Sequence, residues 1–196
     1  MNTKTHDTRQ HILDVGYQLI VAKGFTSVGL SQLLKAADVP KGSFYHYFKS
    51  KEQFGEALIA YYFEQYLARL DEAFNQTAGT GYQRLVGYFS RWLVFDDGQC
   101  NAHKCLVVKL SAEVSDLSEP MREALLRGAN QVTAAIAECI YKGVQDGSIK
   151  QQDTQNAAKS LYSLWLGASL LSKLAQDVSS LELALETTQG LLSVKE

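Results

Sequence analysis

The segment between residues 30 and 51 constrains the fold of this chain more than any other part of its sequence. Apolar residues recur at helical spacing from Leu30 to Ala37, which predicts a short helix. A brief turn follows, and Pro40 then opens a second short helix, because the first helical turn does not need the N–H group that proline lacks. Two short helices joined in this way indicate a helix-turn-helix, whose second helix enters the major groove of DNA.

The second short helix is rich in side chains that donate hydrogen bonds. Ser50 can cap the helix that follows, which leaves Lys51 in a first turn where a cation is unfavourable unless an anion lies there. Such donors, gathered around two helix N-termini, suit a DNA phosphate backbone. We expect base contacts from Ser43 and Tyr47. The full set of predicted DNA-binding residues is Lys41, Ser43, Tyr45, His46, Tyr47 and Lys51.

The rest of the chain is expected to be helical as well. Helical periodicity, with capping residues, glycine and proline at the ends, divides the chain into about nine helices and indicates no strand. We therefore predict an all-α fold, with a three-helix DNA-binding domain over residues 1–51 and a helical effector-sensing and dimerisation domain over residues 52–196. The predicted helices cover 7–23, 30–37, a short segment from 40, 51–74, 82–95, 101–115, 118–145, 153 to beyond 174, and 179–192.

Composition agrees with a helical globule, since 46% of the 196 residues are hydrophobic and only two are proline. No stretch is long and apolar enough to span a membrane, and the first ten residues are polar, unlike a secretory signal, so we expect a cytoplasmic protein. The three cysteines, at positions 100, 105 and 139, match neither a metal-ligand spacing nor an even disulfide framework. We expect free thiols, no metal and no cofactor.

Charge is distributed unevenly along the chain. Residues 1–51 hold seven basic and three acidic side chains, a net charge of +4, whereas the whole chain carries −2, so residues 52–196 carry −6. A basic N-terminal segment joined to an acidic remainder favours a nucleic-acid-binding module attached to a part that DNA repels.

Residues 7–55 resemble the DNA-binding domain of the TetR family of one-component transcriptional repressors. Asp38 stands where the family usually has a turn glycine, and aspartate tolerates a left-handed conformation there. The resemblance implies a homodimer that binds double-stranded operator DNA and responds to a small-molecule or electrophile effector. The matching residues are Gly24-Phe25, Leu33, Ala36-Ala37, Val39, Lys41-Gly42-Ser43-Phe44-Tyr45-His46-Tyr47-Phe48 and Ser50-Lys51.

The resemblance also implies that the last two helices of each protomer pair into a four-helix bundle. Small residues at Gly167-Ala168-Ser169 would allow close approach of helices. Taken by themselves, these stripes are equally typical of an ordinary core. The residues expected on the partner face of the last helix are Ala184, Leu185, Thr188, Leu191 and Leu192.

Cys105 is the strongest candidate for chemistry. His103 and Lys104 precede it, and cationic neighbours favour the reactive thiolate. Residues 105–114, 116–119 and 164–168 look like a branch of the TetR family whose repressors are relieved by electrophiles and oxidants acting on cysteine. The resemblance adds Lys173 as a partner that could stabilise a thiolate or bond to an oxidised sulfur. A lone cysteine in an apolar helix is also typical of a core position.

Other sensing chemistry stays open. Cys100 is expected in an exposed loop, as a second reactive thiol, and Cys139 in the core. An alternative to covalent sensing is a pocket for an aromatic or quinone-like ligand, although aromatic residues at such positions are often plain core. The candidate pocket residues are Tyr88, Trp92, Phe95 and Trp165.

The sequence disfavours an enzyme. It contains no glycine-rich phosphate loop, acid pair or metal cluster, and His103 and Cys105 are too close along one helix to act as a base and a nucleophile. Two further alternatives remain at this stage: a dimeric binding protein that has lost DNA recognition, and a transcriptional activator.

Overall fold

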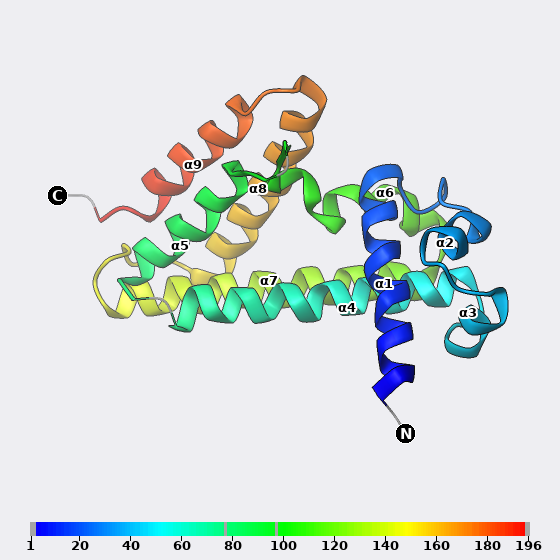
Figure 1. Cartoon of the computed structure of the whole chain (residues 1–196). Coiled ribbons are helices and arrows are strands. Elements are labelled where there is room, and N and C mark those ends of the chain that lie inside the picture. The colour runs from blue at the N-terminus through cyan, green and yellow to red at the C-terminus, as the bar shows by residue number, and fades with distance from the viewer. Residues whose placement is uncertain (1–2, 77, 97, 195–196) are drawn as a thin grey trace. The chain divides into compact units, whose positions relative to one another are not determined.

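The computed structural model describes residues 3–76, 78–96 and 98–194, and these residues contain nine α-helices (Figure 1). The predicted all-α fold is confirmed. None of the described helices is long and apolar enough to cross a membrane. The helices are α1 (Thr3–Lys23), α2 (Leu30–Ala36), α3 (Lys41–Tyr47), α4 (Lys51–Asp71), α5 (Gly81–Ser90), α6 (Leu106–Leu117), α7 (Glu119–Gln145), α8 (Thr154–Ala175) and α9 (Ser179–Leu192).

The chain forms two compact units. Unit 1 comprises residues 1–64 and 109–128, and unit 2 comprises residues 65–108 and 129–196. Helices α4, α6 and α7 contribute residues to both units.

Aromatic rings hold the helix-turn-helix of unit 1 together. Phe44 of α3 is fully buried, and its ring centroid lies 5.2 Å from that of Phe48 and 5.7 Å from that of Phe54 on α4. Each such ring contributes roughly 1.5–3 kcal/mol when it leaves water, so α3 is fixed from its inner face. The outer face of α3 is thereby left to solvent.

The turns of unit 1 follow the sequence signals. Gly24 ends α1 with φ +86°. Asp38 adopts φ +50° between α2 and α3, which confirms the left-handed conformation expected there. The N–H of Gln53 donates to Ser50 Oγ at 3.1 Å, which caps α4 as expected. Pro40 differs slightly from the prediction, because it takes the N-cap position and α3 begins one residue later, at Lys41.

Unit 2 has a core centred on Trp165 of α8, which is fully buried. Its ring stacks on Phe89 of α5 with centroids 4.7 Å apart, and its indole N–H donates to Thr188 Oγ1 of α9 at 2.9 Å. Helices α8 and α9, orange and red in Figure 1, pack along each other. A Cβ atom added to Gly81 would lie 2.3 Å from the Cα of Gly143, so α5 begins directly against the backbone of α7.

Two helix predictions in unit 2 are wrong. The helix expected over 82–95 ends at Ser90, and a 3-10 turn η2 (Arg91–Leu93) leads into two antiparallel two-residue strands, β1 (Phe95–Asp96) and β2 (Gln99–Cys100). The helix expected over 101–115 is broken into a 3-10 turn η3 (Asn101–Lys104) and α6, with Cys105 between them.

Bonds from distant residues explain the break. Ser169 Oγ of α8 donates to the carbonyl of Ala102 at 2.7 Å, and the N–H of Asn101 donates to the carbonyl of Val94 at 2.9 Å. Ser169 lies 67 positions from Ala102 and occupies a carbonyl to which the N–H of Leu106 would donate in a continuous α-helix. The bond to Val94 holds the start of the turn against the preceding segment.

The remaining helices in unit 2 match the expectations closely. Helix α7 starts directly after Ser118 and ends at Gln145, and α9 covers Ser179–Leu192. Asp153 caps α8, since its carboxylate accepts from the N–H groups of Gln155 and Asn156. Helix α4 is followed by a π-helical turn, η1 (Glu72–Gln76), close to the predicted end at Phe74.

Candidate functional site

The outer face of α3 carries the polar side chains singled out from the sequence. Lys41, Tyr45 and His46 are exposed, whereas Ser43 and Tyr47 are half-buried. Lys41 Nζ lies 5.7 Å from the centroid of the Tyr45 ring, and the rings of His46 and Tyr47 meet edge to face. The helix therefore presents an ammonium, a phenol and an imidazole to solvent, with a second phenol and a hydroxyl partly accessible.

Lys51 lies differently from these residues. It is half-buried, its Nζ donates to the carbonyl of Phe25 at 2.8 Å, and the same nitrogen lies 4.5 Å from the centre of the Phe25 ring. Burial lowers the pKa of Lys51, although the carboxylates of Glu52 and Glu113 act in the opposite direction. Its ammonium thus has an intramolecular partner, while the predicted phosphate contact stays a prediction.

Glu113 of α6 is a site residue that the sequence did not indicate. Its carboxylate accepts from the N–H of Phe25 at 3.0 Å, from the N–H of Thr26 at 2.5 Å, and from the Thr26 hydroxyl. Burial alone would raise the pKa of Glu113, but these hydrogen bonds and the charge of Lys51 outweigh it and lower the pKa. Glu113 is 88 positions from Phe25 and 87 positions from Thr26, and no local sequence signal indicates a contact over such a separation.

Cys105 lies in unit 2, at the junction of η3 and α6. The residue is only 8% exposed, and α6 starts with the next residue. A helix N-terminus favours a thiolate, because unpaired backbone N–H groups give that end a partial positive charge. Burial raises the pKa of Tyr88 and of Tyr162 above the usual range of a phenol, and the nearby Cys105 adds to both shifts. The thiol therefore lies among phenols in a mostly apolar core.

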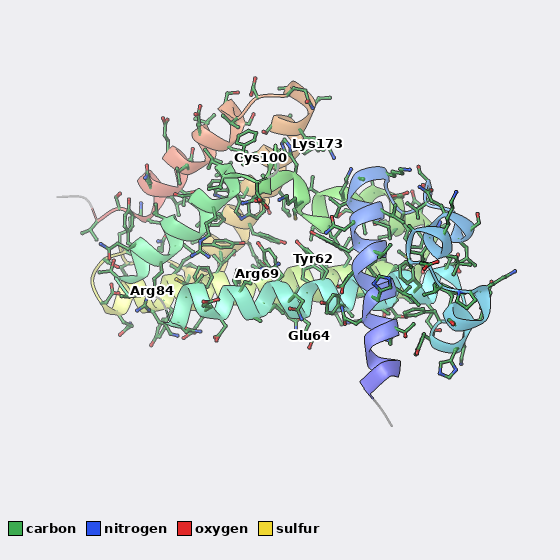
Figure 2. All side chains as sticks on the ribbon, viewed as in Figure 1. Tyr62, Glu64, Arg69, Arg84, Cys100 and Lys173 are labelled. Carbon is green, nitrogen blue, oxygen red and sulfur yellow. The ribbon has the colours of Figure 1, made fainter. Side chains whose placement is uncertain are left out.

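The two residues before Cys105 have partners of their own. His103 Nε2 lies 3.2 Å from Ser172 Oγ, so α8 holds the turn just before the cysteine. Burial and the charge of Lys173 lower the pKa of His103, which places Lys173 close to that ring. Lys104 pairs with Asp96 at 2.7 Å. Figure 2 labels Lys173 on α8 and Cys100 just before η3.

The other two cysteines are core residues. Cys100 is 1% exposed, and its Sγ donates to the carbonyl of Trp92 at 2.9 Å, so the expectation of an exposed second thiol is wrong. Cys139 is 2% exposed, and burial raises the pKa of its thiol to about 12. A thiol so protonated is a poor nucleophile.

Three of the four candidate pocket residues come together in unit 2. Tyr88, Trp92 and Trp165 are buried, and the two indole rings lie 5.7 Å apart. The Tyr88 hydroxyl lies 2.5 Å from that of Tyr66, which places a polar pair beside the aromatic rings. Phe95 does not join them, because it lies on β1 with 59% of its surface exposed.

The last two helices expose part of their apolar surface. Leu174 is 81% exposed, Leu183 is 63% exposed, and nothing crowds a Cβ added at Gly167. Of the residues expected on the partner face of α9, Leu185 and Leu191 are half-buried, while Ala184, Thr188 and Leu192 are fully buried within the protomer. The last three belong to the core because they pack toward α8 and α5 rather than outward. The exposed set on α8 is Gly167, Leu170, Leu171 and Leu174.

Comparison with known proteins agrees with this architecture. Residues 12–58 match the family described as bacterial regulatory proteins, tetR family, and residues 81–188 match the tetracyclin repressor-like C-terminal domain. The HTH-type transcriptional repressor NemR of Escherichia coli K12 is 42% identical over 195 residues, covering 98% of each chain. The repressor DhaR of Mycobacterium sp. GP1 is 31% identical, covering 89% of this chain and 86% of its own.

A solved structure gives the same result. The crystal structure of the reduced form of E. coli NemR superposes with a TM-score of 0.88 at 42% identity, covering 95% of this chain and 98% of that one. The relatives are regulators rather than enzymes. The chain therefore belongs to the TetR family and is a transcriptional repressor closely related to NemR.

Proposed function

We propose that residues 1–51 form the DNA-reading domain, that residues 52–196 form the sensing and dimerisation domain, and that α3 binds operator DNA in the cytoplasm. Lys41, His46 and Tyr45 are exposed on α3, where they can reach phosphates. Ser43 and Tyr47 are the candidates for base edges. Phe44 and Phe48, buried beneath, support this surface on a rigid base.

Lys41→Met tests the phosphate contact. Each phosphate that a cation neutralises releases counterions, so loss of one contact is expected to lower the slope of log K against log salt by about 1. Binding should weaken on all DNA sequences alike. The measurement is a salt titration of binding to the DNA upstream of the gene for this chain, and an unchanged slope would remove Lys41 from the phosphate contacts.

We further propose that α8 and α9 form the homodimer interface. The exposed leucines at positions 170, 171 and 174 of α8 and 183 of α9 support this, because large apolar patches exposed on a soluble protein mark interaction surfaces. A helix-turn-helix of this size also needs two copies, bound at half-sites about 34–36 Å apart or multiples of that spacing.

For induction, we propose that a reactive electrophile acts on Cys105 and releases the repressor from DNA. The observation that carries this proposal is the position of a buried thiol directly before α6, beside a turn that α8 holds through Ser172. The relation to NemR, whose crystal structure was solved in a reduced form, supports it. Lys173, close to His103, is the proposed cation that favours the thiolate.

The proposed reaction is conjugate addition to a quinone or maleimide. The thiolate sulfur forms a bond to the alkene carbon, the π electron pair moves to the carbonyl oxygen as an enolate, and a proton then restores the neutral adduct. The added group cannot fit into a site that is 8% exposed without displacing its neighbours. Displacement of η3 and the start of α6 is the expected consequence.

DNA binding before and after treatment with N-ethylmaleimide tests this proposal. The wild-type protein is expected to lose at least roughly tenfold in affinity, and Cys105→Ser is expected to keep its affinity. Cys139→Ser is the matched control, because that thiol is buried and held protonated, and it should respond as the wild type does. Equal release of wild type and Cys105→Ser would remove Cys105 as the sensor.

The alternative is a non-covalent aromatic or hydrophobic inducer. The Tyr66–Tyr88 hydroxyl pair beside Trp92 supports it, because small-molecule sites combine apolar walls with a few polar groups. A ligand of this kind would release wild type and Cys105→Ser equally and reversibly, so the same titration separates the two mechanisms.

A further inference from the structure

The turn between α1 and α2 is fastened at a single point by residues from two other helices. Its N–H groups at Phe25 and Thr26 donate to Glu113 of α6, and its carbonyl at Phe25 accepts from Lys51 of α4. We name this cluster, consisting of the Phe25–Thr26 turn, Lys51 and Glu113, the turn clamp. All of its members lie in unit 1.

The clamp brackets the helix-turn-helix. The Phe25–Thr26 turn lies just before α2, and Lys51 is the first residue after α3 and its short connection to α4. The bond from Lys51 to the Phe25 carbonyl therefore joins the entrance and the exit of the DNA-reading helices. Glu113 ties that junction to α6. Hydrogen bonds to an ionised carboxylate are stronger than neutral ones, so this attachment is a strong one.

Apolar packing holds the same turn from the other side. Phe25 is 1% exposed, and a Cβ added to Gly55 of α4 would lie 2.6 Å from its ring and 2.7 Å from the Met121 methyl group. We expect this packing to keep the turn folded when the polar bonds are removed. The hydrogen bonds to Glu113 and Lys51 are then expected to affect where the turn lies more than whether it is folded.

Gly24 lies directly beside the clamp, at a position where a side chain would not fit well. Its φ of +86° turns the chain toward Glu113, and a Cβ atom there would lie 3.2 Å from Glu113 Oε2. A side chain at this position would be strained and would also crowd the carboxylate.

We propose that Glu113 is a positioning residue for DNA binding, and that through the turn clamp α6 sets how α2 and α3 are presented to the operator. The proposal rests on the proposed operator contacts of α3, but it does not depend on the chemistry of Cys105. It also gives Lys51 a role within the clamp, which is an alternative to the phosphate contact predicted for it from the sequence.

Charge makes the test of Glu113 a sharp one. Removal of an acidic side chain ordinarily favours binding to DNA, because it reduces repulsion from phosphates. Glu113→Gln keeps the shape but loses the charge, and a carboxamide cannot accept all three hydrogen bonds. Weaker DNA binding by Glu113→Gln would therefore be opposite to the general electrostatic effect. It would indicate that Glu113 acts by positioning α2 and α3.

The experiment compares Glu113→Gln with Glu119→Gln, a control in the same unit whose carboxylate pairs with Arg122 on its own helix. Binding to the upstream DNA fragment is measured against salt, and amide exchange is followed at Phe25 and Thr26. For Glu113→Gln we expect roughly tenfold weaker binding, an unchanged salt slope and faster exchange at both amides. Glu119→Gln should bind as wild type or slightly tighter.

Two further variants keep the proposal falsifiable. Thr26→Val removes only the hydroxyl bond and should show a smaller loss of the same kind, even if Glu113→Gln folds poorly. Lys51→Met should weaken binding with an unchanged salt slope, unlike Lys41→Met. Wild-type affinity in Glu113→Gln and Thr26→Val would overturn the proposal, and a lower slope in Lys51→Met would return Lys51 to the phosphate contacts. If Lys41→Met kept the wild-type salt slope while the other variants behaved as expected, the result would count against the operator contacts of α3 and not against the clamp.

Discussion

Leu174→Arg is expected to convert the protein from a dimer to a monomer and to reduce operator affinity by roughly 100-fold or more. Leu174 is 81% exposed, so the arginine costs the isolated protomer little. In the proposed interface it would bring two unpaired charges into an apolar contact, and burial of an unpaired charge costs several kcal/mol. A monomer also loses the effective concentration by which one bound half-site assists the other, an effect worth about 10²–10⁴.

Sedimentation and DNA binding measure this effect together. Leu126→Arg is the matched control, since Leu126 is also an exposed leucine, 50% accessible, but lies on α7 within unit 1. The control should remain dimeric and bind DNA normally. A Leu174→Arg protein that sediments as a dimer would exclude this part of α8 from the interface.

Trp165→Ala is expected to lower the free energy of unfolding by about 3–5 kcal/mol, the usual cost of deleting a fully buried tryptophan ring. The residue is 0% exposed, stacks on Phe89 and binds Thr188. At roughly 2–4 °C per kcal/mol for a chain of this size, the melting temperature should fall by about 10 °C. Thermal unfolding followed by circular dichroism measures the change.

Trp165→Phe is the control, because it keeps an aromatic ring against Phe89 and loses only part of the buried volume, together with the indole hydrogen bond, worth about 1 kcal/mol. The pair also separates core from pocket wall. A fall of only a few degrees in Trp165→Ala, together with a changed response to aromatic compounds, would indicate that the ring lines a cavity.

Local signals in the sequence were sufficient for most helix ends. Asp153, Ser50 and Gly24 act at their own helix ends, through bonds or backbone angles that involve only nearby residues. Periodicity was similarly reliable for α7, whose apolar stripe repeats over many turns. The surface of α3 was predictable because buried Phe44 and Phe48 determine which neighbours face outward.

Features set by distant residues were not predictable in the same way. Apolar periodicity runs through Ala102, Cys105 and Leu106, so nothing local indicates the break that Ser169 stabilises from α8. The burial of Cys100 depends on the strands around it, and that of Ala184 and Thr188 on α8. Glu113 appears in the sequence as an ordinary charge on a helix, and only the fold brings it to Phe25 and Thr26.

The composition of unit 1 bears on how regulators of this kind can exchange parts. The turn at Phe25 is enclosed by Gly55, Glu113 and Met121, which come from α4, α6 and α7. A chimera joined just after the helix-turn-helix would pair the transplanted turn with unfamiliar residues from another protein at all three of those positions, since Gly55 also follows the junction. Recombination between related regulators should therefore succeed most often when the donor supplies residues 109–128 along with the N-terminal segment.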